Sequence, residues 1–267
     1  MKHHSRMPER KVSETIAAAQ INKTMKEKRM DPLYIKTFLR KGNKKLTDYY
    51  NPDAGVYYKY AQFNIPAKKT CPFATRDCKK FCYAKRDERF VAPRENREKN
   101  FAASLDNDFV ERMIYTIETE LNSKRFRNAV MIVRIHESGD FYNIMYLEKW
   151  IDIMRAFRYD NRVIFQAYTK SFPLFLQLSN FDYVTLRGLM NNGRFALSLS
   201  LDDSMIEAQR ADLLKVLQFL PKCNVYYAVK ADRMDSIKYD TVCDCADCAK
   251  CGNCVRTEGK TIVVAIH

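Results

Sequence analysis

A repeated change of hydrophobic period is the feature that most constrains how this chain can fold. Residues 129–135 read AVMIVRI, an apolar run typical of a strand that a parallel sheet buries on both faces. A helical pattern follows over 144–157. The same patterns predict strands at 56–67, 162–169, 183–189, 195–201, 224–230 and 261–267, and helices at 96–123, 172–180 and 204–219.

Strands that alternate with helices predict parallel strands joined by crossover helices. The fold class expected is therefore α/β, with either an open doubly wound sheet or a (β/α) barrel, complete or partial. We expect a basic helical N-terminal arm at residues 1–45 and an α/β barrel domain at 46–267. The domain would include a cysteine loop at 71–84 and a C-terminal cysteine-rich segment at 243–254.

Polar residues gather where the predicted strands end, and ligands of both architectures bind at that edge. The expected site residues are His136, Glu137, Ser138, Gly139 and Asp140 after the second strand, then Tyr168, Thr169, Lys170 and Ser171, then Ser200 and Asp202. Any of them could instead be structural. His136 in particular could be a strand-end histidine that hydrogen bonds satisfy.

Whether the cysteines form disulfides or bind metal depends on the cellular compartment in which the protein is expected. The first residues, MKHHSRMPERK, contain no apolar run resembling a signal peptide, and no apolar stretch of about 18 residues occurs. A cytoplasmic protein without membrane contacts is therefore expected. In a reducing cytoplasm, closely spaced members of the nine cysteines predict metal or cluster ligands rather than disulfides.

The loop CPFATRDCKKFCYA contains Cys71, Cys78 and Cys82 in the spacing C-x6-C-x3-C. Three thiolates would bind Zn²⁺ if a fourth ligand came from elsewhere, or would hold three irons of a [4Fe-4S] cluster and leave the fourth iron open. The lysines and arginines around the loop are expected to lower the thiol pKa values.

A denser group, VCDCADCAKCGNCV, lies near the C-terminus. Four thiolates would complete either a Zn site or a second Fe–S cluster, with Cys248, Cys251 and Cys254 at its core and Cys243 or Cys245 as a further ligand. The alternative is a zinc clip that only holds the tail.

The net charge of +14 arises in two segments, 1–45 and 68–99. The natural partner of such segments is a polyanion, here a nucleic acid or nucleotide, because neutralising phosphates releases counterions. A solvated basic surface is the alternative.

Three segments, CPFATRDCKKFCYA, VRIHESGDFYNIMYLEKW and FQAYTKS, in that order, resemble the gene product 88 family of bacteriophage proteins. A host cytoplasm would then be the location. A cysteine loop after the first strand, with Phe81 before Cys82, also resembles the radical S-adenosylmethionine enzymes, which usually show C-x3-C-x2-C.

The second resemblance implies a barrel of that type, a [4Fe-4S] cluster at 71–82, bound S-adenosylmethionine and an electron donor as a partner. It would place Glu137 or Asp140 near the methionine amino group. Tyr168, Thr169 and Ser171 would lie near the ribose, and the SLSLD strand, with Ser200 and Asp202, resembles the small-polar strand often seen there.

Three functions follow from these patterns. The first is an iron–sulfur enzyme of radical S-adenosylmethionine type that cleaves S-adenosylmethionine reductively and acts on a polyanionic substrate. The second is a nucleic-acid-binding phage protein that zinc or an Fe–S cluster stabilises, without catalysis. The third is a non-radical enzyme in which an open metal position acts as a Lewis acid.

Overall fold

The computed structural model describes residues 38–42, 46, 48–52, 55–243, 251–256 and 258–266. The described residues belong to one compact unit that begins at Phe38. Most of the arm expected at 1–45 lies outside the described residues, so the predicted boundary at residue 45 stays a prediction.

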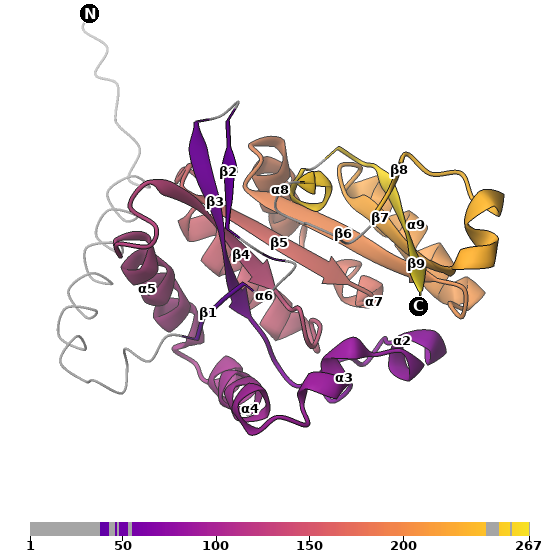
Figure 1. Ribbon diagram of the computed structural model, residues 1–267, viewed down its shortest axis with the longest axis horizontal. Helices are drawn as coiled ribbons and strands as arrows, with labels where there is room; N and C mark the ends of the chain where they lie inside the picture. Colours follow the sequence, from indigo (N-terminus) through magenta and orange to yellow (C-terminus); the bar gives the residue numbers. More distant parts are fainter. Residues whose placement is uncertain are drawn as a thin grey trace, which may run out of the picture. The chain divides into compact units, whose positions relative to one another are not determined.

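The described strands form one nine-stranded, mostly parallel sheet (Figure 1). Its parallel strands pair in the order β3 (Val56–Phe63), β4 (Ala129–Ile135), β5 (Val163–Thr169), β6 (Phe195–Asp202), β7 (Asn224–Lys230) and β9 (Thr261–Ile266). At the edges, β1 (Arg40–Lys41) and β2 (Tyr49–Asn51) pair antiparallel with β3, and β8 (Thr241–Val242) pairs parallel with β9. The predicted α/β class with a parallel sheet is confirmed.

The order of the parallel strands does not reverse from β3 to β9. Right-handed crossovers that always step in one direction leave their helices on one face of the sheet. A doubly wound sheet differs, because its strand order reverses at a switch point. Pairing of the described strands ends at β1 and β8 without joining the two edges, so an open sheet is what is observed and the barrel remains a prediction.

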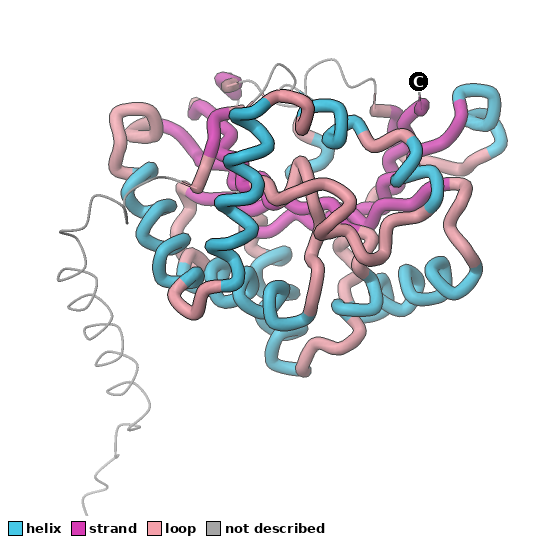
Figure 2. Tube along the Cα trace, turned by 90° about the horizontal axis from the view of Figure 1, so that it is seen from below, coloured by secondary structure: helices cyan, strands magenta, loops and turns pink. Residues whose placement is uncertain are grey.

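A row of helices covers one side of the sheet (Figure 2). In it α5 packs against α6, α6 against α8 and α7 against α9. The row contains α5 (Phe109–Leu121), α6 (Ile144–Ala156), α7 (Phe172–Phe175), α8 (Asn180–Asn191) and α9 (Glu207–Phe219). Before it in the chain come α2 (Arg76–Lys80), α3 (Tyr83–Asp87) and α4 (Val91–Leu105). None of these helices combines the length and apolar character needed to cross a membrane.

Three predicted elements differ from the structure. The helix expected at 172–180 ends at Phe175. The helix expected at 96–123 is two helices, because the backbone becomes extended at Asp106. The strand expected at 183–189 lies inside α8. Ser179 caps that helix in a reciprocal capping box with Asp182, and its buried residues recur at helical spacing: Tyr183, Leu186, Leu189 and Met190.

The two faces of the sheet differ in chemistry, because successive side chains of a strand point to opposite faces. The face turned toward the helices, here called the helix face, contributes Val133, Phe165 and Leu197 to the main apolar core. On the opposite, open face, Gln62, Arg134 and Gln166 stand in register on adjacent strands. This open face holds the candidate site.

Candidate functional site

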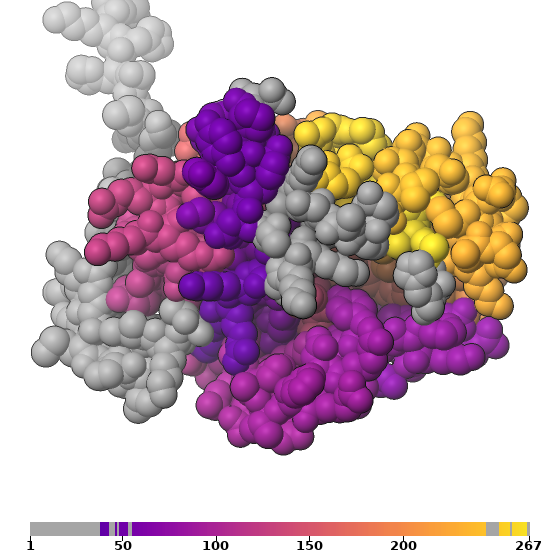
Figure 3. All heavy atoms as spheres, viewed as in Figure 1, coloured from indigo at the N-terminus to yellow at the C-terminus, as the bar shows by residue number. Residues whose placement is uncertain are grey.

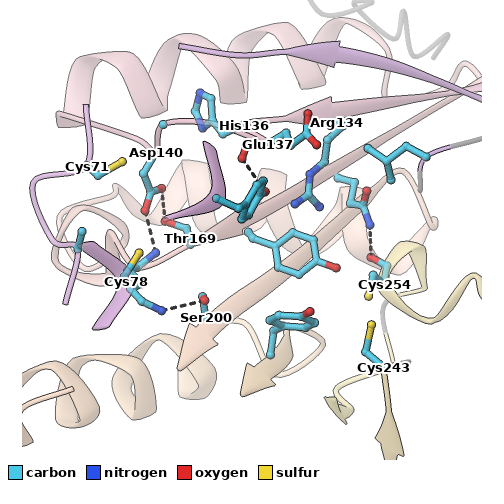
Figure 4. Close-up of a pocket in the computed structure, with 18 of the residues that line it drawn as sticks. Cys71, Cys78, Arg134, His136, Glu137, Asp140, Thr169, Ser200, Cys243 and Cys254 are labelled. Atoms are coloured by element: carbon cyan, nitrogen blue, oxygen red, sulfur yellow. Dashed lines mark hydrogen bonds between the residues drawn. The ribbon is translucent and has the colours of Figure 1, made fainter. Parts of the chain in front are cut away.

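A cavity of about 650 Å³ lies over the open face, a volume typical of sites for small molecules. Side chains of β3 to β7 line it, and both cysteine-rich segments contribute to its walls. Figure 4 shows Cys71 and Cys78 at one end of this main cavity, with Cys243 and Cys254 at the other. The fold therefore brings two segments that are far apart in the sequence to one cavity.

The cysteine loop is fastened to the end of β6. Thr75 caps α2 by accepting a hydrogen bond from the Cys78 amide (3.2 Å), and its hydroxyl donates to the Asp202 carboxylate. The backbone N–H of Asp77 donates to Ser204 Oγ at 2.9 Å. Asp202 therefore acts as an anchor for the loop.

Lys170 completes this anchor at the end of β5. Its Nζ lies 3.2 Å from Asp202 Oδ2 and donates to Ser200 Oγ at 2.9 Å. Burial raises the pKa of Asp202, but Lys170 and the hydrogen bonds from Thr75 and Ser204 outweigh it and hold that pKa below its usual value. The Asp202 carboxylate is therefore ionised at neutral pH.

The turn HESGD is shaped by the segment that follows β3. Asn64 Oδ1 accepts the backbone N–H groups of Glu137 (2.7 Å) and Ser138 (3.2 Å). Gly139 has φ +89°, and a Cβ there would lie 2.3 Å from Ile65 Cγ1, so this position requires glycine. Ser138 Oγ donates to the Ile65 carbonyl, which gives Ser138 a structural role.

Asp140 joins the ends of β4 and β5. Its carboxylate accepts from Thr169 Oγ1 (2.7 Å), from the backbone N–H of Lys170 (2.9 Å) and from its neighbour Phe141 (2.7 Å). Burial raises the pKa of Asp140, although these hydrogen bonds oppose the rise. Ser171 extends the junction, since its Oγ donates to the Phe141 carbonyl at 2.7 Å.

His136 belongs to an aromatic cluster with residues of α6. Its Nε2 lies 2.7 Å from Tyr146 Oη, and its ring packs edge-on against Phe141 and Trp150. Burial, with a smaller effect of Arg134, lowers the pKa of His136 to about 3, so the ring is neutral. These contacts fit the structural interpretation of His136. Its Nδ1, however, has no hydrogen-bond partner among the described residues, and the residue lines the main cavity, so its role stays a prediction.

The expected lowering of the thiol pKa values does not occur at two of the three loop cysteines. Burial raises the pKa of Cys71 to about 12, and the charge of Asp140 adds to the rise. Burial also raises the pKa of Cys78, although Lys170 opposes it. Desolvation outweighs the basic surroundings because most basic residues of the loop point to solvent.

The loop cysteines suit a thiophilic metal or cluster in chemistry, and their charges are close enough to interact. Cys82 occupies the N-cap position of α3 without a side-chain capping hydrogen bond, and it does not line the main cavity. Among the described residues, no three His, Cys, Asp or Glu side chains converge as a metal site. Binding a cluster at 71–82 would require the three sulfurs to turn toward one another.

The C-terminal segment contributes the far wall. Cys243, Cys251 and Cys254 line the cavity, whereas Cys245 and Cys248 lie outside the described residues. Gln166 Nε2 donates to the Cys254 carbonyl at 3.0 Å, which ties this segment to β5. The ligand set expected at 243–254 therefore stays a prediction.

Arg134 is the most informative residue that the sequence reading missed. Its guanidinium lies 3.9 Å from the centroid of the Tyr168 ring, and the Tyr226 ring crosses Tyr168 at 5.0 Å. Arg134 Nε and Gln166 Oε1 are buried without hydrogen-bond partners among the described residues. The signal available in the sequence was a polar residue inside an otherwise apolar strand.

Glu137 and Asp140 of the HESGD turn both line the cavity. Hydrogen bonds hold the Asp140 carboxylate at the strand ends. The Glu137 backbone carbonyl accepts from Tyr83 Oη at 2.8 Å, and burial raises the pKa of the Glu137 side chain despite Arg134 and Arg97. Tyr168, Thr169, Lys170 and Ser200 line the same cavity. The arrangement thus combines a cation, polar side chains and aromatic rings, which suits an anionic ligand with a planar group.

The family model of gene product 88 matches residues 37–257. The chain belongs to the gene product 88 family. The match includes both cysteine-rich segments and all strands of the parallel sheet except β9. No curated protein and no solved structure gave a significant match. The predicted membership in gene product 88 is confirmed, and the resemblance to radical S-adenosylmethionine enzymes stays a prediction.

Proposed function

We propose that this gene product 88 protein is an iron–sulfur enzyme of the radical S-adenosylmethionine type that acts on a nucleic acid or nucleotide. The observation that carries the proposal is the main cavity of about 650 Å³ with Cys71 and Cys78 at one end. A thiolate-bound centre there would face a space large enough for S-adenosylmethionine and part of a substrate.

Cys71, Cys78 and Cys82 would hold a [4Fe-4S] cluster with one open iron. The chemistry that such a group supplies is the one-electron reductive cleavage of S-adenosylmethionine, with an external electron donor. A partial (β/α) barrel is the finer fold that goes with this proposal, and the consecutive order of β3 to β7 supports it.

The residues of this chain would bind and orient the reactants. Thr75 and Asp202 hold the cysteine loop against β6. Lys170 places a positive charge beside Cys78, where it offsets thiolate charge. Arg134, stacked on Tyr168, offers the floor of the cavity a cation for a phosphate or carboxylate. At the opposite wall, Cys243 to Cys254 would bind a second Fe–S cluster or Zn²⁺.

Anaerobic purification followed by iron, sulfide and zinc analysis tests the proposal first. Dithionite and S-adenosylmethionine are then added and 5′-deoxyadenosine is measured. We expect about four irons for each cluster and formation of 5′-deoxyadenosine. Stoichiometric zinc without iron, or an intact cluster that forms no 5′-deoxyadenosine, would refute the enzyme.

Matched cysteine variants assign the cluster to the loop. Cys78→Ala should lose the iron of this site and all 5′-deoxyadenosine formation. Cys223→Ala is the control, because Cys223 is 1% exposed and lies in the apolar core away from the main cavity. If both variants retain iron and activity equally, the loop does not hold the catalytic cluster.

A nucleic-acid-binding protein without catalysis is the second candidate function. The observation that favours it is the exposed basic surface of the segment 68–99, which needs no redox centre to bind a polyanion. Under this alternative, Cys78→Ala would leave nucleic-acid binding and its salt dependence unchanged, and no 5′-deoxyadenosine would form.

A further inference from the structure

The surface formed by α2, α3, α4 and β1 combines exposed aromatic rings with cations. Phe90 is 65% exposed and Phe81 is 46% exposed, and Lys80 Nζ lies 5.1 Å from the Phe81 ring centroid. The exposed cations are Arg40, Lys41, Lys79, Lys80, Arg86, Arg89 and Arg94. In Figure 3 the purple atoms of α2 to α4 lie beside the indigo atoms of the first strands.

Most of this positive charge is not neutralised within the described part of the chain. The salt bridges along α2 to α4 involve different cations from these seven. Their basic partners are Arg76, Lys85 and Arg97, together with Lys69, which pairs with Glu98. Rows of unpaired cations between exposed aromatic rings are the arrangement with which proteins bind single-stranded nucleic acid.

A second cavity, of about 310 Å³, opens on this surface. Arg40 and Lys41 of β1 line it, together with Phe90, the N-cap residue of α4. No side chain caps the first turn of this helix. Because Pro93 has no N–H and the Phe90 N–H donates to the Asp87 carbonyl, the N–H groups of Val91 and Ala92 are the ones left for an anion.

An independent observation at this cavity also indicates a ligand. Gln62 lines the cavity and is 3% exposed, and its Nε2 has no hydrogen-bond partner among the described residues. Its Oε1 accepts from Asn64 Nδ2 at 3.2 Å, which fixes the amide with Nε2 as the remaining donor. An uncharged donor, two cations and a helix N-terminus are groups that hydrogen-bond a phosphate, and the cavity has room for one.

The small cavity adjoins the main one. Asp87 and Glu137 line both, so they form the wall between them. The Asp87 carboxylate lies 3.5 Å from the Arg97 guanidinium, which offsets its charge. A phosphate in the small cavity would therefore stand next to the compartment that the cysteine loop and Arg134 line.

We propose that this surface binds a single strand of DNA or RNA, with one phosphate in the small cavity and bases stacked on Phe90 and Phe81, so that an adjacent nucleotide reaches the main cavity. The inference rests on the proposed nucleic-acid substrate and specifies its form. A single strand is required because the faces of bases in a duplex are already stacked and cannot cover protein rings.

Fluorescence anisotropy of the full chain with labelled oligothymidylate, oligouridylate and a blunt DNA duplex tests this inference. No S-adenosylmethionine or reductant is present, so binding is measured independently of the proposed reaction. Phe90→Ala should weaken single-strand binding by about 5- to 150-fold. Phe181→Ala is the matched control, because Phe181 is equally exposed (64%) but lies on α8, and it should leave affinity unchanged.

The salt dependence of binding separates the contribution of the charged residues Arg40 and Lys41 from that of the uncharged donor Gln62. Replacing both Arg40 and Lys41 by Gln should reduce the slope of log K against log salt concentration by about 1.4, since each contact with a single strand contributes about 0.7. Gln62→Leu should lower affinity without changing the slope, because it removes no charge. The basic arm remains present in every variant, so its contribution is constant.

Tight binding of either single strand supports the inference, and the tighter of the two shows which of these strands is preferred. Equal effects of Phe90→Ala and Phe181→Ala, an unchanged slope in the double variant, or a duplex bound as tightly as the single strands would overturn it. These outcomes are separate from the proposed reaction. Loss of binding with intact 5′-deoxyadenosine formation refutes only the surface, and the reverse result refutes only the enzyme.

Discussion

The two faces of the sheet both carry buried side chains, but those side chains differ in what they contact. Phe165 and Gln166 are neighbours on β5, 1% and 2% exposed. Phe165 packs on Phe157 in the apolar core. Gln166 faces the main cavity and leaves its Oε1 without a partner among the described residues. The helix face thus provides stability, and the open face keeps polar groups available for a ligand.

The largest expected effect on the free energy of unfolding is at Phe165, and a substitution of its neighbour Gln166 provides the comparison. Phe165→Ala should lower the free energy of unfolding by about 3–5 kcal/mol, because it leaves a cavity in a packed core. Gln166→Leu should change it by less than about 1.5 kcal/mol, since the replacement is similar in size and one amide atom is already unpaired. Urea unfolding of both variants measures the difference, and equal losses would contradict the division between the faces.

The next effect concerns pH and His136, which follows β4, packs against aromatic rings of the core and also lines the main cavity. The pKa of His136 is about 3 in the folded chain and about 6.5 when unfolded. Between these values the unfolded state binds the extra proton, so stability is complete above pH 6.5 and falls as pH decreases toward 3. The expected loss is about 1.4 kcal/mol for each pH unit within this window.

Urea midpoints of the wild type and His136→Gln at about pH 7 and pH 5 check this expectation, since the glutamine variant should lose less stability on acidification. An NMR titration of the His136 ring in the wild type provides a second measurement. A ring that titrates near pH 6.5 in the folded protein would contradict the buried, neutral assignment.

A smaller effect on stability, with a larger one on binding, is expected at Arg134 of the open face. Arg134→Met should change the free energy of unfolding by at most about 1 kcal/mol, because it removes a desolvated charge and retains much of the side-chain volume. It should weaken the binding of a mononucleotide about tenfold or more, since hydrogen bonds to charged groups contribute about 1.5–3 kcal/mol. Calorimetry measures the binding, with Arg158→Met, an exposed arginine, as control.

The smallest effect distinguishes two buried serines. Ser171 Oγ donates to the Phe141 carbonyl at 2.7 Å, so Ser171→Ala should cost about 1 kcal/mol. Ser198 lies on β6, and its Oγ has no partner among the described residues. Ser198→Ala should therefore be neutral or slightly stabilising, as thermal unfolding would show. A loss at Ser198 as large as that at Ser171 would mean that its hydroxyl is satisfied.

Much of the fold was predictable because strands buried in a parallel sheet appear in the sequence as apolar runs, which alternate with segments of helical periodicity. The apolar run AVMIVRI is β4, and the predicted strands at 162–169, 195–201 and 224–230 match β5, β6 and β7 within one residue at each end. Segment 183–189 was misread because its aromatic and β-branched residues favour a strand, whereas the cap at Ser179 begins a helix.

The site was predictable only to the level of strand ends. Parallel strands bring their carboxyl ends to one edge, which is why the HESGD turn, Lys170 and the cysteine loop meet. Which side chains of that turn face the cavity depends on the backbone, since His136 and Gly139 both have positive φ. Asn64 and Thr75, which hold the turn and the loop, were missed because their partners lie distant in the sequence.

The sequence by itself determined the α/β class, the family and the position of the cysteine-rich segments, because these depend on local period and motif. Only the tertiary structure decided that Cys71 and Cys254 face one cavity, that burial raises the Cys71 pKa, and that Arg134 lies on the open face. The physical reason is that alternation along a strand defines two faces, whereas the direction of the crossovers decides which of them the helices cover.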